Sequence, residues 1–130
     1  MVIPASLIEE IVSAAKSSSV EICGLLFGER SGEEIRVIEA KAITNRLKSP
    51  EAFEMEPLEM VKVIDDAEGR GLEVVGIFHS HLKCPPRPSE RDLEGMKNWR
   101  VPWLIIDDKE NYGAFVLEGE KVREVDVRVV

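Results

Sequence analysis

A nearly continuous apolar run, from Val74 to Phe78, is the feature that most limits what this chain can fold into. Because the run does not alternate between apolar and polar residues, it predicts a strand that is buried on both faces. Such a strand has to lie inside a sheet that is covered on either side by other layers of structure. The run leads directly into His79, Ser80 and His81, so polar side chains stand at its end.

The rest of the sequence supplies the helices and strands that such a sheet needs. A first helix is predicted from Pro4 to Ser18, because proline suits a helix start and apolar residues recur at helical spacing behind it. A second helix starts near Pro57 and stops at Gly69 or Gly71, and a third follows Ser89. Strands are predicted at Ile22–Gly28, Ile35–Thr44, Phe53–Met55, Val101–Ile106, Tyr112–Leu117 and Val122–Val129. The fold class is therefore α/β, with a mixed β-sheet flanked by helices.

The length and composition fit one ordinary globular domain. The chain has 130 residues, within the usual range of single domains, so we expect one domain over residues 1–130. Hydrophobic residues make up 44% and charged residues 32%, which is not the composition of a disordered chain. Glutamine is missing and asparagine occurs only three times, a bias that resembles thermophilic proteins.

Charge and hydropathy exclude two classes of partner. The formal net charge is -8 and the pI about 4.9, so the surface would repel phosphate backbones and we expect no nucleic acid as main partner. No apolar run approaches the roughly 20 residues that cross a bilayer, so we expect no membrane partner. The N-terminus lacks a signal peptide pattern, and the predicted location is cytoplasmic.

The only two histidines of the chain, His79 and His81, form a candidate metal site. Residues two apart on a strand project from the same face, so the two imidazoles would lie side by side at the end of the buried strand. Neutral imidazole is a preferred ligand of zinc, and a catalytic zinc has three protein ligands and one open position. A His-x-His pair alone is more often surface or packing chemistry than a metal site.

Asp92 is the best candidate for a third ligand. The segment from Leu82 to Pro88 carries three prolines and predicts a stiff, extended loop. Ser89 with Asp92 before Leu93 is a helix N-terminus signature, so Asp92 would lie in the first turn of a helix that begins beside the histidines. By itself this signature indicates no more than a helix cap. Ser89 can begin the helix through its backbone while its hydroxyl points elsewhere.

These residues resemble the JAMM motif, also called MPN+. The motif is His-Ser/Thr-His, seven residues and Ser-x-x-Asp, and here it is matched by His79-Ser80-His81 and Ser89-Glu90-Arg91-Asp92. The segment Glu21–Gly28 resembles the family's upstream Glu-x-x-Gly strand. The resemblance implies a JAB/MPN domain, a fold similar to that of cytidine deaminases. Active members are zinc isopeptidases that remove ubiquitin or ubiquitin-like modifiers from lysines.

The resemblance also implies roles for single residues. His79, His81 and Asp92 would bind one Zn²⁺ per chain, Glu21 would be the acid/base, and Ser89 would donate to the oxyanion. Prokaryotic members are short single domains that act on ubiquitin-like or sulfur-carrier proteins ending in Gly-Gly. The expected partner is therefore such a modifier and its conjugates, and the expected reaction is hydrolysis of the (iso)peptide bond after that tail.

Two departures concern the residues near this motif. Leu82 stands where the family usually has proline, which should alter the loop and not the ligands. Cys84 lies in the same loop and is expected to be exposed, where it would form a disulfide-linked homodimer or, as a thiolate, inhibit the zinc site. Cys23 is expected to be buried, on the same strand face as Glu21.

Four other functions compete with this one, and the sequence argues against the first of them. A zinc deaminase would need His-x-Glu and Cys-x-x-Cys, which the chain lacks. A structural zinc site would need a fourth protein ligand, for which only Cys84 is available. A non-catalytic MPN scaffold, which binds proteins, would be expected to lack the ligands. A peptidase that trims the tail of a sulfur carrier or releases cysteine from it would share the same site.

Overall fold

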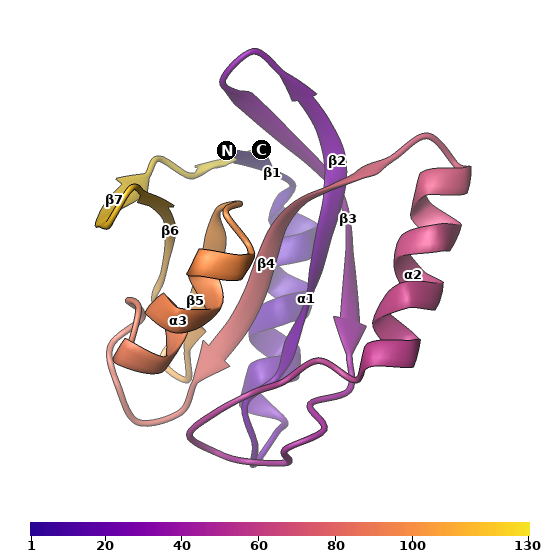
Figure 1. Ribbon diagram of the computed structural model, residues 1–130. Helices are drawn as coiled ribbons and strands as arrows, with labels where there is room; N and C mark the ends of the chain where they lie inside the picture. Colours follow the sequence, from indigo (N-terminus) through magenta and orange to yellow (C-terminus); the bar gives the residue numbers. More distant parts are fainter.

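One eight-stranded mixed sheet organises the computed structural model, which describes all residues from Met1 to Val130 (Figure 1). The strands lie in the order β7-β6-β5-β4-β2-β3-β1-β8. β4 pairs in parallel with β5, β1 pairs in parallel with β3 and β8, and the other neighbours are antiparallel. The elements are β1 (Val2–Ile3), α1 (Ala5–Lys16), β2 (Cys23–Ser31), β3 (Glu34–Ile43), α2 (Pro57–Gly69), β4 (Glu73–His81), α3 (Glu90–Asn98), β5 (Trp103–Asp107), β6 (Tyr112–Glu118), β7 (Lys121–Val125) and β8 (Arg128–Val129).

The two edges of the sheet lie close together because the sheet is curled. β7 and β8 occupy opposite ends of the strand order, yet only Asp126 and Val127 separate them in the chain. The prediction of one continuous strand from Val122 to Val129 is therefore wrong: the chain leaves one edge after β7 and joins the other as β8, beside β1. β1 itself was not predicted, because a strand of two residues before a proline shows no periodicity.

The helices lie on both faces of the sheet, as the buried strand requires. α1 packs its apolar side, with Ile8 and Ile11, against residues of the sheet such as Leu26 and Phe78. α2 and α3 lie on the other face, where Ala67 and Met96 join a second apolar cluster (Figure 1). None of the three helices is long and apolar enough to span a membrane.

β4 is the central strand and carries the predicted histidines. It lies between β2 and β5, and every residue from Val75 to His81 is buried. The prediction of a doubly buried strand is confirmed. The predicted strand Phe53–Met55 is reduced to a single bridge between Asn45 and Met55, because Asn45 uses its side chain to hold this segment as a loop.

Candidate metal centre

His79 and His81 stand at the end of β4, and strand pairing fixes both. His79 lies between Cys23 of β2 and Ile105 of β5, and His81 is paired with Asp107. The two side chains point to the same face, as expected for positions two apart on a strand. Their exposed fractions are 0% and 2%, so both imidazoles are removed from water.

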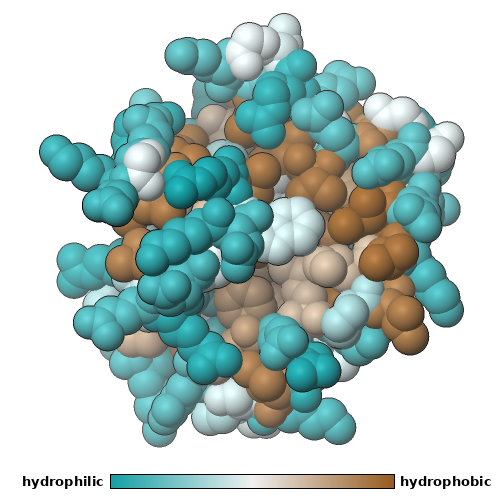
Figure 2. All heavy atoms as spheres, in the orientation of Figure 1, coloured by the Kyte–Doolittle hydropathy of each residue, from teal (hydrophilic) through white to brown (hydrophobic).

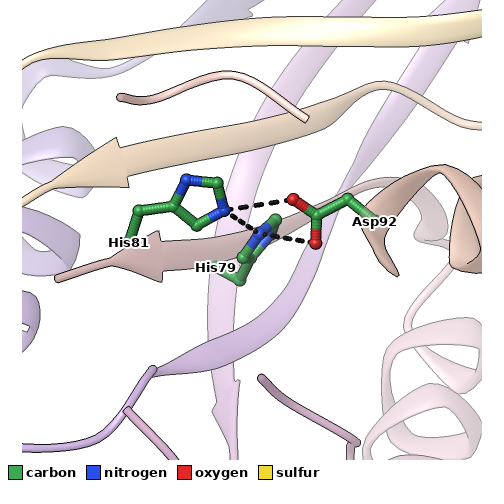
Figure 3. A group of neighbouring side chains, drawn as sticks. All are labelled: His79, His81 and Asp92. Carbon is green, nitrogen blue, oxygen red and sulfur yellow. Dashed lines mark hydrogen bonds and ion pairs between the residues drawn. The ribbon is translucent and has the colours of Figure 1, made fainter. Parts of the chain in front are cut away.

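Asp92 reaches the two histidines from the first turn of α3 (Figure 3). Its Oδ1 lies 3.1 Å from His79 Nε2, and its Oδ2 lies 3.1 Å from His81 Nε2. The two Nε2 atoms are themselves 3.1 Å apart. The structure thus brings together the three residues that the sequence singled out, with the candidate ligand atoms all within 4.8 Å of one another.

This donor set fits zinc. At a tetrahedral zinc with Zn–N bonds of about 2.0–2.1 Å, the ligand atoms lie about 3.3 Å apart, close to the spacing seen here. His81 Nδ1 donates to the carbonyl of Pro85 at 2.8 Å, since a carbonyl can only accept, and this leaves the lone pair of Nε2 facing the centre. His79 Nδ1 is the buried polar side-chain atom that has no hydrogen-bond partner.

The site keeps its carboxylate charged and one histidine neutral. Burial opposes ionisation of Asp92, but its contacts with His79 and His81 outweigh burial and hold its pKa far below the usual range. Burial lowers the pKa of His79. Burial also opposes charge on His81, yet the hydrogen bonds to Asp92 and to the Pro85 carbonyl raise its pKa. An anionic oxygen and a neutral imidazole are the forms in which these groups bind metal.

Glu21 is a buried carboxyl at the edge of this centre, with an exposed fraction of 4%. Burial raises its pKa to about 7, against the opposing charge of His81 and with some help from Asp92. A carboxyl with this pKa can both accept and release a proton near neutral pH. Glu21 precedes β2, which begins at Cys23, so the prediction that both residues share a strand face is wrong.

Cys23 is buried, as predicted, and has a structural contact of its own. Its thiol donates to the carbonyl of Ile43 at 3.3 Å. Burial, with the nearby charge of Glu21, raises its pKa to about 12. Cys23 is therefore a buried thiol in the core and not a metal ligand or nucleophile. Cys84 is exposed, as predicted, and both cysteines are free.

Ser80, between the two histidines, holds the Glu21 segment, a role that was not predicted from the sequence. Its hydroxyl accepts a hydrogen bond from the backbone N–H of Ile22 at 2.9 Å, and its own N–H donates to the Ile22 carbonyl at 3.1 Å. The residue after Glu21 is thus tied to the strand that carries both histidines. A buried serine between two histidines was the only available signal.

Ser89 caps α3 with its hydroxyl. The hydroxyl oxygen accepts from Asp92 N–H at 3.1 Å, and Ser89 N–H donates to Asp92 Oδ2 at 2.9 Å, which makes a capping box. The prediction of a cap is confirmed, but the expectation that the hydroxyl points away from the helix is wrong. A hydroxyl also carries one donor proton, and that of Ser89 has no acceptor within the protein.

Two aromatic rings enclose His79, and neither was predicted as part of the site. Phe53 stacks on the imidazole with ring centroids 4.6 Å apart and an interplanar angle of 30°. Trp103 meets the same imidazole edge-on at 5.7 Å. Phe53 belongs to the loop before α2 and Trp103 to β5, so their approach depends on the tertiary fold. Their aromatic character alone could not place them here.

A cavity of about 310 Å³ adjoins the centre. It opens between α2 and α3, where Figure 2 shows a hollow with apolar atoms inside a largely hydrophilic rim. Phe53, Trp99 and Trp103 supply much of its apolar lining, and Asp92 and Arg91 line it as well. The centre is therefore reached from a recess large enough for part of a peptide chain.

A match to a protein-family model shows which family the chain belongs to. A model of the prokaryotic homologs of the JAB domain matches residues 4–118. The chain belongs to this prokaryotic JAB family. The family resemblance that was seen in the motif residues is thereby confirmed, and so is the predicted JAB/MPN fold.

Two curated relatives match most of the length of this JAB protein. It is 51% identical to a desampylase of Pyrococcus furiosus over 99% of this chain and 90% of the relative. It is 36% identical to a probable TtuB-protein conjugate cleaving protease of Thermus thermophilus over 92% of this chain and 78% of the relative.

The solved structures show the same fold. A solution structure of a protein from Desulfitobacterium hafniense superposes with a TM-score of 0.90 at 29% identity, covering 99% of this chain and 92% of that chain. A JAB1/MPN domain protein from Archaeoglobus fulgidus gives a TM-score of 0.67 at 25% identity, covering 100% and 97%. The curled mixed sheet with its three helices is thus the JAB/MPN architecture.

Proposed function

We propose that this JAB protein is a zinc-dependent isopeptidase that hydrolyses the bond after the C-terminal Gly-Gly of a ubiquitin-like modifier or sulfur-carrier protein. The observation that carries the proposal is the meeting of two imidazole nitrogens and one carboxylate within 4.8 Å of one another. The similarity to a desampylase and to a conjugate cleaving protease supports the choice of substrate class.

His79, His81 and Asp92 would hold one zinc ion per chain. Their ligand atoms already converge, so metal binding needs little rearrangement of this part of the chain. When bound, zinc supplies Lewis-acid chemistry: it polarises a carbonyl and makes water acidic enough to ionise at about pH 7. Strand pairing and the capping box hold the three side chains in place, and Asp92 lines the recess.

Glu21 would move the proton in this reaction. Its carboxylate would accept the proton of the attacking water and then deliver it to the amine of the leaving lysine. The pKa of about 7 supports both steps, because each protonation state is accessible near neutral pH. Ser80 would keep the Glu21 segment in register with the histidines, through its two hydrogen bonds with Ile22.

Ser89 would stabilise the oxyanion that forms at the attacked carbonyl. The hydroxyl oxygen is occupied as the cap of α3, and this fixes its position beside Asp92. Its proton remains free to donate. A neutral, short donor at such a position typically contributes about 3–4 kcal/mol to the transition state.

The recess between α2 and α3 would receive the chain on either side of the cleaved bond. A Gly-Gly tail offers backbone groups and no side chains, so it would bind in an extended conformation. Removal of a modifier from lysine, trimming of a carrier tail and release of cysteine from a carrier all use the same chemistry. These three reactions differ only in what leaves, and the substrate test has to distinguish them.

The decisive experiment incubates the protein with three substrates that share one carrier ending in Gly-Gly: a lysine isopeptide, a linear peptide extension and a cysteine adduct. Mass spectrometry of the products, with and without a metal chelator, reports which bond is cut. We expect chelator-sensitive release of the lysine conjugate, restored by added zinc. Absence of chelator-sensitive cleavage of all three would overturn the proposed function and favour a protein-binding scaffold.

The same proposal places the enzyme in the cytoplasm, where the free thiols of Cys23 and Cys84 would stay reduced. Under oxidising conditions the exposed Cys84 would link two chains into a homodimer. Non-reducing gel electrophoresis of the wild type beside Cys84→Ser tests this link, since a band of twice the mass has to vanish in the variant. An unchanged pattern would remove the dimer.

A further inference from the structure

The two histidines of the centre are oriented by different means. His81 has the usual arrangement of a metal-binding histidine, because its second nitrogen donates to the carbonyl of Pro85 at 2.8 Å. His79 lacks this arrangement, since its Nδ1 is buried and has no hydrogen-bond partner. A second hydrogen bond normally fixes the rotation of a ligating imidazole. Something else has to fix the rotation of His79.

The contacts of Phe53 supply that restraint. Its ring stacks on the imidazole at 4.6 Å with an interplanar angle of 30°, while Trp103 closes the site edge-on at 5.7 Å and 84°. Stacked and edge-on ring pairs at such distances attract each other beyond the burial of their surfaces. A ring held between a parallel and a perpendicular neighbour cannot rotate without losing both contacts. Trp103 is itself held, because its indole N–H donates to the carbonyl of Trp99 at 3.0 Å.

Phe53 lies in a loop, so its position depends on Asn45. The buried Asn45 amide donates to the carbonyl of Ala52 at 2.9 Å, and its oxygen accepts from the N–H of Glu54 at 3.1 Å. These bonds hold the backbone on both sides of Phe53. The same amide donates to the carbonyl of Glu21 at 2.9 Å, and the same oxygen accepts from Leu47 N–H at 3.1 Å. The Asn45 side chain therefore donates two hydrogen bonds and accepts two, which uses its full capacity.

We propose that Asn45 and Phe53 form a positioning unit for the metal centre: Asn45 anchors Phe53 to the backbone of Glu21, and Phe53 orients His79 by stacking. The inference rests on the proposed function for the identity of the metal, but it concerns metal affinity and not turnover. It explains how a loop outside the motif is built into the centre. Phe53 and Asn45 are positioning residues, since neither touches the reacting atoms.

The test measures zinc affinity by competition with a chromophoric chelator, without any substrate. In Phe53→Leu the apolar volume stays and the flat ring is lost, so we expect the zinc dissociation constant to rise by about 10-fold or more, as for other residues that orient metal ligands. Phe53→Tyr keeps the ring and should stay within about threefold of the wild type. The visible spectrum of the cobalt-loaded protein should change in Phe53→Leu and not in Phe53→Tyr.

Phe27→Leu is the matched control, because Phe27 is fully buried in the same apolar cluster but lies opposite Val74, far along the strand from His79. It should lower thermal stability at least as much as Phe53→Leu and leave zinc affinity unchanged. A zinc dissociation constant of Phe53→Leu within twofold of the wild type would overturn the inference, and so would an equal loss of affinity in Phe27→Leu.

Asn45→Ala provides the second arm. If Asn45 acts on the metal through Phe53, Asn45→Ala should weaken zinc binding in the wild type and add little in the Phe53→Leu background. If the losses of zinc affinity in Asn45→Ala and Phe53→Leu add in full in the double variant, Asn45 does not act through Phe53, and the inference is contradicted. A wild type that binds zinc and follows this pattern but cleaves no Gly-Gly conjugate would leave the positioning unit intact and overturn only the proposed function.

Discussion

The site has a strand side and a loop side, and they are built differently. The strand side is His79, Ser80 and His81, which β4 carries between two paired neighbours. The loop side is Glu21, Phe53 and Ser89, which stand outside the strands and helices. Side-chain hydrogen bonds hold the backbone beside them. Sheet register positions the strand side regardless of any one side chain. On the loop side, one substitution can move the neighbouring backbone.

This difference separates two kinds of failure. A substitution on the strand side should remove a chemical group and leave the surrounding backbone in place, because 75 backbone hydrogen bonds in the protein, most of them within strands and helices, do not depend on it. A substitution on the loop side should change position as well as chemistry.

His81→Ala should have the largest effect and should act through metal binding alone. The variant loses one ligand atom, and its zinc content and cleavage should fall to the level of the chelator-treated wild type. Its β-sheet content should not change, because His81 is paired through its backbone. Metal analysis and circular dichroism check both statements. Lys83→Ala, in the exposed loop nearby, is the control and should keep both metal and turnover.

Glu21→Gln should separate metal binding from proton transfer. The amide fills the space of the carboxyl but cannot accept a proton, so kcat should fall by about 10²–10⁴-fold. Zinc content should stay at the wild-type value, since Glu21 is not among the converging ligands. Single-turnover cleavage and metal analysis on the same sample measure both. Wild-type kcat in this variant would remove Glu21 from the reaction.

Ser89→Ala should reveal the two functions of one hydroxyl. The loss of the oxyanion donor should lower kcat by about 10²–10³-fold. The loss of the cap should lower the free energy of unfolding by about 1 kcal/mol. Ser89→Gly is the matched variant, since glycine caps a helix almost as well but has no hydroxyl. If the two variants lose kcat equally but differ in their free energy of unfolding, the donor and the cap are separate functions of the hydroxyl. A kcat that falls in step with the free energy of unfolding would contradict this.

Ser80→Ala should show how much the link between the two sides contributes. Without the hydroxyl, the N–H of Ile22 loses its acceptor, and the free energy of unfolding should fall by about 1–3 kcal/mol. Turnover should fall less than in Glu21→Gln, because the carboxyl remains. Denaturant unfolding and kcat measure the two effects. Ser80→Thr keeps a hydroxyl and should recover most of both, whereas no recovery would mean that packing, not the hydrogen bond, is responsible.

The smallest effect is a pH dependence of the metal-free protein. The pKa of Glu21 is raised to about 7 in the folded state, so the protein takes up a proton on folding at intermediate pH. The free energy of unfolding therefore falls as the pH rises from the ordinary pKa of a glutamate carboxyl through 7. Glu21→Gln lacks this penalty. Its gain in free energy of unfolding over the wild type should therefore be larger at pH 8 than at pH 5, by about 1 kcal/mol after solvent screening. Equal gains would contradict the raised pKa.

The strand side could be predicted from the sequence, and the loop side only in part. The apolar run Val74–Phe78 and the spacing of His79 and His81 specify a buried strand with two side chains on one face, because strand geometry is local. Ser89 and Asp92 were found because a helix start has a local signature. These patterns need no knowledge of the tertiary fold.

The contacts that were missed are all long-range in the chain. Asn45 bonds to the carbonyl of Glu21, Ser80 to Ile22, and Phe53 stacks on His79, and no periodicity encodes such pairs. The split of the predicted strand Val122–Val129 has the same origin, because it follows from the curl of the whole sheet. Local patterns therefore identified the three converging side chains, and the tertiary fold determined which residues contact them.

Zinc titration of the metal-free wild type measures whether cleavage depends on one metal ion per chain. Stoichiometry by native mass spectrometry and cleavage of a lysine-linked Gly-Gly conjugate are followed in the same titration. We expect cleavage to rise in proportion to added zinc and to stop rising at one zinc per chain. Cleavage by the metal-free protein, or a chain filled with zinc at His79, His81 and Asp92 that cleaves nothing, would contradict it.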